Sequence, residues 1–232
     1  MFQRLAVDRG AILFDSERVA APGRQLFERN YWSARGALTE QTSGRGSIHF
    51  IDGNGHRWVM RRYLRGGMAA LVARDHYVFL GEERTRSFRE LRLLEALKQL
   101  DLPVPAPIAA CYRREFVTYT AALITERLPG ASSLSEMLAS GRMNDARWAA
   151  IGRCLRRFHD SGVQHADLNA HNIMLGESGE VWLLDFDRGR LREPGAWHGR
   201  VLDRLARSLA KISNGTGEWQ SGFALLRLAH DG

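Results

Sequence analysis

Three polar residues in the C-terminal half of the chain could do chemistry together: Asp167, Asn172 and Asp185. Asn172 follows Asp167 by five positions, and Asp185 follows Asn172 by thirteen. Two carboxylates and a carboxamide can supply a proton acceptor and two oxygen ligands for Mg²⁺, the hard cation that phosphoryl-transfer enzymes use. We therefore assign Asp167 as the candidate catalytic residue, and Asn172 and Asp185 as candidate metal ligands.

The sequence around these residues predicts the elements that hold them. The order His-x-Asp-Leu-x-x-x-Asn, followed by Leu-Asp-Phe, matches the catalytic loop and metal-binding strand of protein-kinase-like enzymes. A helix over 148–159, with apolar residues on one face, leads into the loop. Two apolar strands, 173–175 and 181–184, flank a turn at 176–179 and fix the separation of the two metal ligands. His165 is expected to brace the loop through hydrogen bonds.

An earlier pair of glycines marks a candidate nucleotide-binding loop. The turn between the first two strands of a predicted three-stranded meander contains Gly44, Arg45, Gly46 and Ser47. Glycine has no Cβ, so the backbone N–H groups of such a turn can approach phosphate closely. The pattern is incomplete, because His49 stands where the third glycine of the kinase loop would fall.

The third strand of that meander, predicted at 58–63, should carry the basic residue that grips the nucleotide phosphates. Kinases place a lysine there, and the matching position here is Arg61. The neighbouring Arg62 stays open as the alternative. Strand alternation favours Arg61, because it lies on the same face as Val59. Arginine can hold phosphate oxygens, although its reach and shape differ from those of lysine. A solvated arginine at a strand end is the other interpretation.

Glu90 has two interpretations. Apolar residues recur at helical spacing from residue 87 to residue 100, which predicts a helix. Ser87 could be the N-cap of this helix, with Glu90 completing a capping box. Alternatively, Glu90 lies where a kinase-like fold uses a glutamate to pair with the basic residue of the third strand, which would place it in the nucleotide site.

The order of elements predicts an α+β, bilobal, protein-kinase-like fold with a small antiparallel-sheet N-lobe and a mainly helical C-lobe. Residues 1–126 would form the N-lobe, with an N-terminal extension, the glycine-rich loop, the sheet and one helix. Residues 127–232 would hold the catalytic loop, the metal site and the acceptor site. Only 47 residues follow Asp185, too few for the activation segment and peptide-docking helices of a protein kinase. We therefore expect a compact acceptor and no protein substrate.

The charge of the chain is strongly biased towards arginine. The formal net charge is +7, and Lys98 and Lys211 are the only lysines among 33 basic residues. Arginine binds carboxylates and phosphates as a bidentate fork, so the bias suits an acidic substrate or an anionic membrane surface. A GC-rich genome explains the same bias equally well. No aromatic–basic interleaving or known module indicates nucleic-acid binding.

Cys111 and Cys154 lie far apart in the sequence and form no CxxC pair, which favours free thiols in a reducing compartment. The N-terminus lacks the apolar core of a signal peptide. No stretch approaches the about 20 apolar residues of a membrane-spanning helix. We therefore expect a cytoplasmic protein whose only membrane contact is at a surface.

Four stretches of the sequence together resemble the 3-deoxy-D-manno-octulosonic acid (Kdo) kinase family: 61–67, 83–90, 165–175 and 183–192. This family is similar to the lipopolysaccharide heptose kinases and to the eukaryotic-like kinase fold. The resemblance covers roughly residues 30 to 230. It implies a phosphotransferase with an alcohol acceptor, which uses ATP to phosphorylate the 4-hydroxyl of Kdo on a lipid A precursor in lipopolysaccharide core biosynthesis. It also implies peripheral attachment to the cytoplasmic side of the inner membrane. Only the family's catalytic aspartate is carried over, onto Asp167.

Two other functions compete with this one. A soluble small-molecule kinase of the aminoglycoside type binds cationic acceptors and would need an acidic cleft, which the basic run at 188–192 disfavours. A nucleotide-binding pseudokinase scaffold is prompted by Arg61 and by the missing third glycine. The intact set of Asp167, Asn172 and Asp185 disfavours a pseudokinase.

Overall fold

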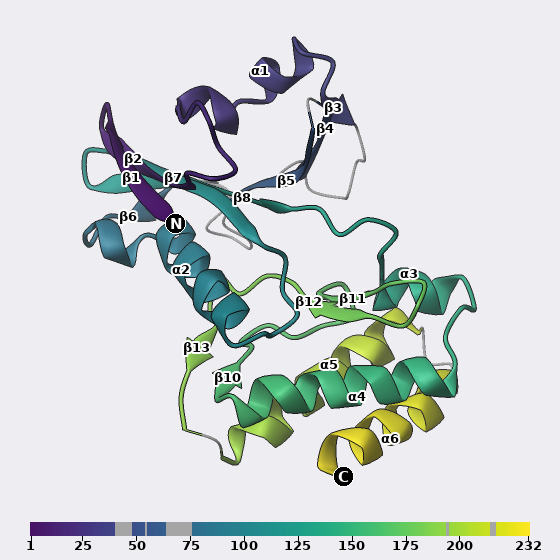
Figure 1. Cartoon of the computed structure of the whole chain (residues 1–232). Helices are drawn as coiled ribbons and strands as arrows, with labels where there is room; N and C mark the ends of the chain where they lie inside the picture. The colour runs from purple at the N-terminus through teal and green to yellow at the C-terminus, as the bar shows by residue number, and fades with distance from the viewer. Residues whose placement is uncertain (40–47, 54, 64–75, 194, 214–216) are drawn as a thin grey trace. The chain divides into compact units, whose positions relative to one another are not determined.

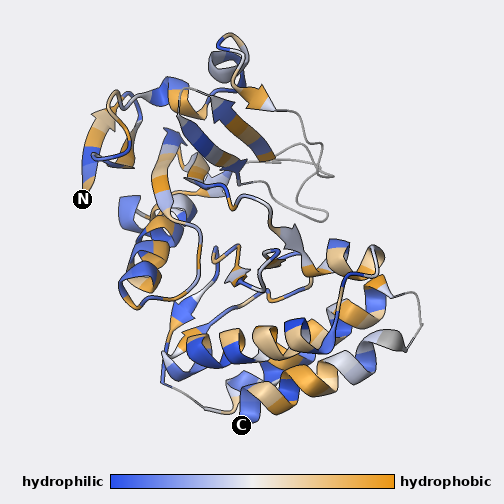
Figure 2. Cartoon of the chain, turned by 45° about the vertical axis from the view of Figure 1, so that its right-hand side comes forward, coloured by the Kyte–Doolittle hydropathy of each residue, from blue (hydrophilic) through white to orange (hydrophobic). Residues whose placement is uncertain are grey.

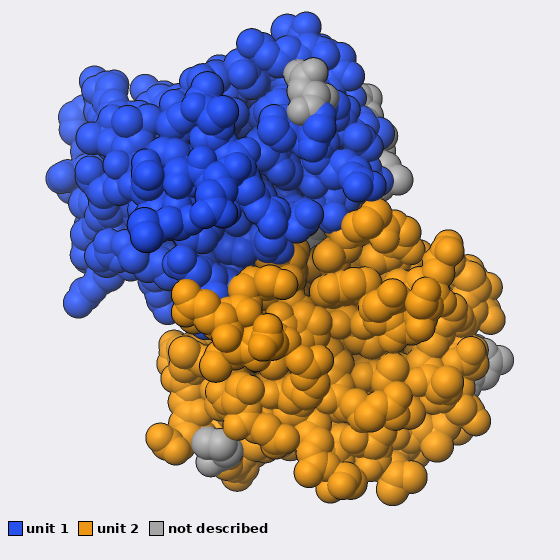
Figure 3. All heavy atoms as spheres, in the orientation of Figure 1, with its two compact units in different colours: residues 1–95, 106–127 blue, residues 96–105, 128–232 orange. Residues whose placement is uncertain are grey.

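The computed structural model describes residues 1–39, 48–53, 55–63, 76–193, 195–213 and 217–232. The chain forms two compact units, drawn in different colours in Figure 3. The first unit comprises residues 1–95 and 106–127, and the second comprises 96–105 and 128–232. The predicted division at 126/127 differs from these units in two places: Arg127 belongs to the first unit, and residues 96–105 belong to the second. This segment is tied there by hydrogen bonds from Leu183 N–H to the Pro103 carbonyl (3.1 Å) and from the Arg157 guanidinium to the Asp101 carbonyl (2.6 Å).

An antiparallel sheet is the framework of the first unit (Figure 1). Its strands follow the order β1-β2-β7-β8-β5-β4-β3, and β6 pairs with β8. The strands are β1 (Phe2–Val7), β2 (Gly10–Asp15), β3 (Leu38–Thr39), β4 (Ile48–Gly53), β5 (His56–Arg62), β6 (Tyr77–Val78), β7 (Pro107–Glu115) and β8 (Thr118–Glu126). The predicted meander of β3, β4 and β5 is confirmed, and the register pairs Gly53 with His56 across the predicted turn.

The N-terminal segment packs on this sheet and completes the core of the first unit. The 3₁₀ helix η1 (Arg24–Phe27) and the short helix α1 (Arg29–Ser33) bury Leu26, Phe27 and Trp32. These side chains join a cluster with buried residues of β2, β4, β5, β7 and β8. The indole N–H of Trp32 donates a hydrogen bond to the Leu26 carbonyl (2.8 Å), so burial of the ring leaves its polar atom satisfied.

Helix α2 (Arg86–Gln99) follows the 3₁₀ helix η3 (Glu82–Arg84) and buries the predicted apolar stripe except for Leu100, which lies beyond its end and is exposed. The predicted capping box is wrong. The helix begins at Arg86, whose N–H donates to the Tyr119 hydroxyl (3.0 Å). Ser87 therefore lies inside the first turn, and its hydroxyl donates to the Cys111 carbonyl (2.8 Å) instead of capping the helix. Glu90 is consequently available to another partner.

Four helices are the main elements of the second unit, and Figure 2 shows that they combine hydrophobic and hydrophilic residues, as amphipathic helices do. They are α3 (Leu134–Ala139), α4 (Asp145–Asp160), α5 (Trp197–Ile212) and α6 (Glu218–Asp231). Two small antiparallel sheets accompany them, one of β9 (Ser132–Ser133), β11 (Ile173–Leu175) and β12 (Val181–Leu183), the other of β10 (Val163–Gln164) and β13 (Arg190–Leu191). The predicted α+β class, with a sheet first and helices afterwards, is confirmed.

Local sequence explains where two helices of the second unit, α3 and α4, begin. Ser133 and Glu136 form a reciprocal capping box at the start of α3, with the Ser133 hydroxyl accepting from the Glu136 N–H (3.2 Å). The Asn144 side chain accepts from the Arg147 N–H (2.9 Å) and caps α4. Within the described residues, no helix has the length and apolarity needed to cross a membrane.

Both cysteines are free thiols, as predicted. Cys154 is buried on α4, and burial raises the pKa of its thiol to about 12. Burial also raises the pKa of the Cys111 thiol to about 12. A thiol with so high a pKa is almost entirely protonated at neutral pH and is a poor nucleophile. The structure therefore assigns neither cysteine to the chemistry of the molecule.

Helices α4 and α6 approach closely because glycine lies at their contact. A Cβ on Gly152 of α4 would overlap the backbone carbonyl oxygen of Leu226 on α6. A Cβ on Gly222 of α6 would overlap the indole of Trp148 on α4. Because the first of these neighbours is backbone, a larger residue at Gly152 can be accommodated only if one helix shifts.

We predict that Gly152→Ala lowers the free energy of unfolding by about 1–3 kcal/mol, the usual cost of overpacking a filled interface. Gly199→Ala on α5 is the matched control, since a Cβ there meets no heavy atom within 4 Å. That control should be neutral or stabilising by up to about 1 kcal/mol, the difference in helix propensity. Denaturant unfolding of both variants gives the comparison, and equal effects at the two glycines would contradict the close approach of α4 and α6.

Candidate active site

The candidate catalytic loop, residues 165–172, joins β10 to β11 and is anchored by its first residue. His165 is 3% exposed. Its Nε2 donates to the Leu184 carbonyl (2.8 Å), and its Nδ1 accepts from the Asp167 N–H (3.2 Å). Burial lowers the pKa of His165, so these bonds are made by a neutral ring with the proton on Nε2. The predicted bracing role of His165 is confirmed.

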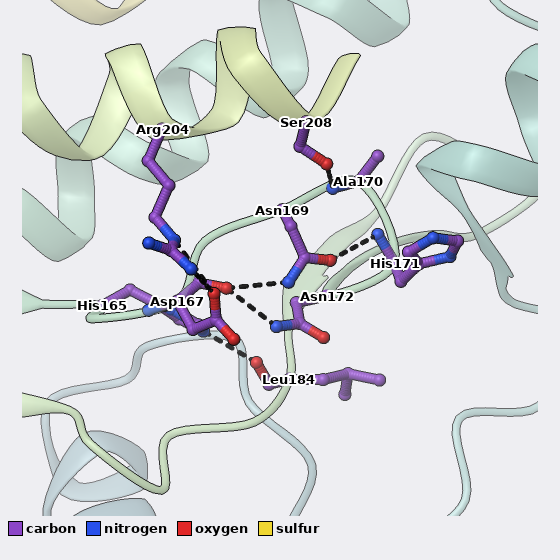
Figure 4. Close-up of polar contacts among 9 residues, drawn as sticks. All are labelled: His165, Asp167, Asn169, Ala170, His171, Asn172, Leu184, Arg204 and Ser208. Atoms are coloured by element: carbon purple, nitrogen blue, oxygen red, sulfur yellow. Dashed lines mark hydrogen bonds and ion pairs between the residues drawn. The ribbon is translucent and has the colours of Figure 1, made fainter. Parts of the chain in front are cut away.

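The backbone carbonyl of Asp167 ties the loop together. It accepts hydrogen bonds from the side-chain amides of Asn169 (2.9 Å) and Asn172 (3.0 Å), as Figure 4 shows. The other end of the Asn169 carboxamide accepts from the His171 N–H (2.9 Å). Because the amide nitrogen of Asn172 is bonded to this carbonyl, its oxygen is the end of the side chain suited to a cation. The candidate base and the first candidate metal ligand thus share one hydrogen bond.

Helix α5 contacts the same loop through two side chains one turn apart (Figure 4). The Arg204 guanidinium forms an ion pair with Oδ1 of Asp167 through its Nε (2.9 Å) and through one terminal nitrogen. The Ser208 hydroxyl accepts from the Ala170 N–H (3.2 Å). Asp167 and Arg204 are 53% and 48% exposed, so both remain accessible to a ligand. The ion pair engages only one oxygen of the Asp167 carboxylate.

Asp185 follows β12 in an unusual backbone conformation. Its φ is +64°, in the left-handed region that aspartate tolerates better than most residues other than glycine and asparagine. The next side chain, Phe186, is buried, stacks on Phe158 and lies 4.7 Å from the His165 ring, centroid to centroid. The N–H of Leu184 donates to the Asn172 carbonyl (2.9 Å). The residue immediately before Asp185 is therefore hydrogen-bonded to the catalytic loop, which fixes the position of the Asp185 backbone.

The oxygens of Asn172 and Asp185 fit the donor chemistry of Mg²⁺, which takes one or two protein oxygens and completes its shell with phosphate and water. No group of three or more His, Cys, Asp or Glu side chains in the described residues could hold a metal ion by itself. The binding of Mg²⁺ by these two residues stays a prediction.

In the first unit, Arg61 and Glu90 are in direct contact. The Arg61 guanidinium lies 2.6 Å from Oε2 and 2.7 Å from Oε1 of Glu90. Glu90 is 2% exposed, and the Tyr63 hydroxyl donates to it as well (2.6 Å). The ion pair between β5 and α2 belongs to Arg61, while Arg62 is exposed. Contact of this pair with a nucleotide stays a prediction, and Gly44, Arg45, Gly46 and Ser47 lie outside the described residues.

Several contacts of the site were not predicted from the sequence. The pairing of Arg204 with Asp167 joins residues 37 positions apart, and no local pattern indicates it. Tyr63 beside Glu90 was missed in the same way, although the strand alternation that placed Arg61 also places Tyr63 on the same face. Asn169 was not predicted because its side chain only bridges backbone groups of the loop: it donates a hydrogen bond to the Asp167 carbonyl and accepts one from the His171 N–H.

Comparison with known proteins gives a consistent result. The model of the lipopolysaccharide kinase (Kdo/WaaP) family matches residues 29–224. Three curated relatives named 3-deoxy-D-manno-octulosonic acid kinase are similar over most of their length. The relative from Stenotrophomonas maltophilia K279a is 47% identical over 96% of this chain and 90% of its own. Those from Xanthomonas euvesicatoria pv. vesicatoria 85-10 and Xylella fastidiosa 9a5c are 50% and 48% identical, each over 88% of this chain and 81% of its own.

Among solved structures, WbdD in complex with the kinase inhibitor LY294002 is similar with a TM-score of 0.47 and 19% sequence identity. The match covers 81% of this chain and 43% of that one. A likeness of this size supports no conclusion about the chemistry of this chain.

Mg²⁺ should increase the affinity of the protein for ATP. We predict that this increase is at least about tenfold smaller in Asp185→Asn, because a neutral carboxamide is a poorer ligand for a hard dication. Asparagine tolerates the left-handed backbone, so the free energy of unfolding should stay within about 0.5 kcal/mol of the parent. Asp185→Val is the contrasting variant and should be less stable by about 1–3 kcal/mol, since a β-branched residue is strained at this φ. Calorimetric titration and denaturant unfolding separate the two effects, and unchanged Mg²⁺ dependence in Asp185→Asn would remove this residue from the metal site.

Proposed function

This chain belongs to the lipopolysaccharide kinase (Kdo/WaaP) family, and we propose that it transfers the γ-phosphoryl group of ATP to the 4-hydroxyl of a Kdo residue on a lipid A precursor. It is a kinase with a sugar hydroxyl as acceptor, as its 47–50% identical relatives are named. The observation that carries the assignment of roles is the loop in which the Asp167 carbonyl is bonded to Asn172 while the Asp167 carboxylate stays half exposed.

The step divides among residues of this chain as follows. Oδ2 of Asp167, the oxygen that Arg204 does not engage, accepts the proton of the acceptor hydroxyl. The acceptor oxygen then bonds to the γ-phosphorus, and the bond from that phosphorus to the bridging oxygen of ADP breaks. When bound, Mg²⁺ would neutralise the charge of the phosphates, and Asn172 and Asp185 are the residues to hold it. The Arg61–Glu90 pair is suited to positioning the α- and β-phosphates.

The competing functions fit the described residues less well. An aminoglycoside kinase needs acidic groups around its cationic acceptor, whereas helix α5 brings arginine to the base. A pseudokinase would gain nothing from an exposed carboxylate held beside a second oxygen ligand. The family match favours neither of them.

We predict that Asp167→Ala lowers kcat for transfer of labelled phosphate from ATP to Kdo-lipid A precursor by at least about 100-fold, the usual contribution of a general base. ATP binding should be largely intact. Asp203→Ala is the matched control, because Asp203 is an exposed carboxylate on the same helix as Arg204. The assay should offer an aminoglycoside and a generic protein beside the glycolipid. Full turnover in Asp167→Ala would refute the assignment of Asp167 as the base. If the parent protein phosphorylated only the aminoglycoside, the acceptor would be an aminoglycoside and not Kdo.

We also propose that the protein associates peripherally with the cytoplasmic side of the inner membrane, since its acceptor is a lipid. A patch in the first unit supports this localisation. The hairpin between β7 and β8 exposes Phe116 (94%) and Val117 (71%), and the Phe79 N–H bonds to the Val117 carbonyl, which brings the exposed Leu80 (66%) near them. Arg113 and Arg114 precede this tip and are exposed. Apolar side chains flanked by arginine suit insertion into an anionic bilayer surface.

The double variant Phe116→Asn/Val117→Ser should bind vesicles containing phosphatidylglycerol at least about tenfold more weakly, because it loses two apolar side chains worth about 1.5–3 kcal/mol each when buried. Asparagine is chosen because Phe116 has a φ of +53°. Leu228→Ser provides the control, as Leu228 is 71% exposed on α6. Sedimentation with vesicles measures both, and equal losses in the double variant and the control would contradict a role for the hairpin.

A further inference from the structure

Helix α5 has two sharply different sides. Five residues face the core and are buried: Trp197, Val201, Leu202, Leu205 and Leu209. Four cations are exposed at spacings of four, three and four positions: Arg200, Arg204, Arg207 and Lys211. These spacings place all four on one face of the helix, which we name the α5 basic face.

The α5 basic face is poorly compensated by the rest of the described protein. Arg204 pairs with Asp167, but Arg200, Arg207 and Lys211 have no carboxylate within ion-pair distance among the described residues. Like charges three and four positions apart disfavour a helix. The exposed Asp203 lies three positions after Arg200 and four before Arg207 but is not within ion-pair distance of either, so bound anions would offset repulsion that the helix itself leaves.

The α5 basic face is continuous with the catalytic loop. Arg204 holds Oδ1 of Asp167, and Ser208, one turn further on, bonds to the backbone of Ala170 (Figure 4). The two contacts seat the helix beside the carboxylate that receives the acceptor's proton. An anion bound along this face would accordingly belong to the molecule whose hydroxyl reacts.

We propose that the α5 basic face binds the anionic groups of the acceptor glycolipid, an inference that rests on the proposed function. Arg204 contacts the carboxylate of Kdo, and Arg200, Arg207 and Lys211 contact the phosphates of the lipid A portion. The guanidinium of Arg204 uses its Nε and one terminal nitrogen on Asp167, so its other terminal nitrogen can donate to a second anion. In Kdo a single ring carbon separates the carbon bearing the 4-hydroxyl from the carbon bearing the carboxylate. Adjacent Asp167 and Arg204 side chains can therefore engage both groups of one sugar.

The phosphate contacts are tested with the triple variant Arg200→Gln/Arg207→Gln/Lys211→Gln of the full chain. Its KM for Kdo-lipid A precursor should rise about tenfold, as expected for three exposed ion pairs, while KM for ATP and kcat at saturation stay unchanged. The same glycolipid treated with phosphatase should be used equally well by parent and triple variant. Arg153→Gln, an exposed arginine on α4, is the control and should match the parent.

Two results would overturn this part of the proposal. One is an unchanged KM of the triple variant for the phosphorylated acceptor. The other is a loss of binding to acceptor-free phosphatidylglycerol vesicles that is as large, in fold-change, as the rise in KM for the acceptor. That result would show that the α5 basic face binds the membrane and not the acceptor. A parent enzyme that phosphorylates no Kdo acceptor would instead refute the proposed function, so the two failures are distinguishable.

The contact of Arg204 with the carboxylate is tested by crossing Arg204→Gln with an acceptor whose Kdo carboxylate is reduced to an alcohol. The parent should prefer the natural acceptor by at least about tenfold in kcat/KM, as for a hydrogen bond between charged groups. Arg204→Gln should be slower on both acceptors and should lose the preference. If the preference persists in Arg204→Gln, the residue only positions Asp167 and the contact is refuted. Unchanged ATP binding and unfolding temperature verify that the variant is folded.

Discussion

The site depends on one backbone atom, the carbonyl oxygen of Asp167. Asn169 and Asn172 both donate to it, and the neighbouring N–H is bonded to His165. All of these partners are uncharged, and the burial of His165 keeps its ring neutral. The backbone of the loop is therefore held by uncharged groups, while the ion pair between Arg204 and Oδ1 of Asp167 leaves Oδ2 to face the ligands. A rigid neutral support of this kind is what a reaction governed by positioning requires, because a small displacement of the base reduces the rate strongly.

In the first unit, by contrast, a charged group is buried: the carboxylate of Glu90 lies where water barely reaches it. Glu90 is 2% exposed and is satisfied by Arg61 and by the Tyr63 hydroxyl. A buried carboxylate with only one of these partners would be costly, and breaking such a pair is strongly destabilising. The pair links β5 to α2, so the arginine that would grip a nucleotide is fixed by the core. The sheet positions β5, and the apolar stripe of α2 positions Glu90.

Much of this organisation could be predicted from the sequence, and the exceptions have physical causes. Spacing indicated Asp167, Asn172 and Asp185, because hairpins and loops of fixed length leave few ways to hold three oxygens. Helical and strand periodicity located α2, α4 and the meander to within a few residues. The capping box at Ser87 was wrong because a local pattern cannot show that the Tyr119 hydroxyl and the Cys111 carbonyl, distant in sequence, take over the polar groups of that turn. The Arg204–Asp167 pair was out of reach for the same reason, since only tertiary folding brings α5 to the loop.

The chemistry of the loop and the cations beside it come from separate stretches of chain. Residues 165–172 contain no lysine or arginine, and the cation that reaches Asp167 is supplied by α5. The two parts meet through the exposed Arg204 and the partly buried Ser208, while the fully buried residues of the helix serve the core. Apart from Arg204, the exposed cations of α5 are thus carried by a different element from the loop residues proposed for the reaction. An engineer seeking a new sugar acceptor would therefore randomise Arg200, Arg207 and Lys211 and keep both Arg204 and the loop, with little risk to the fold.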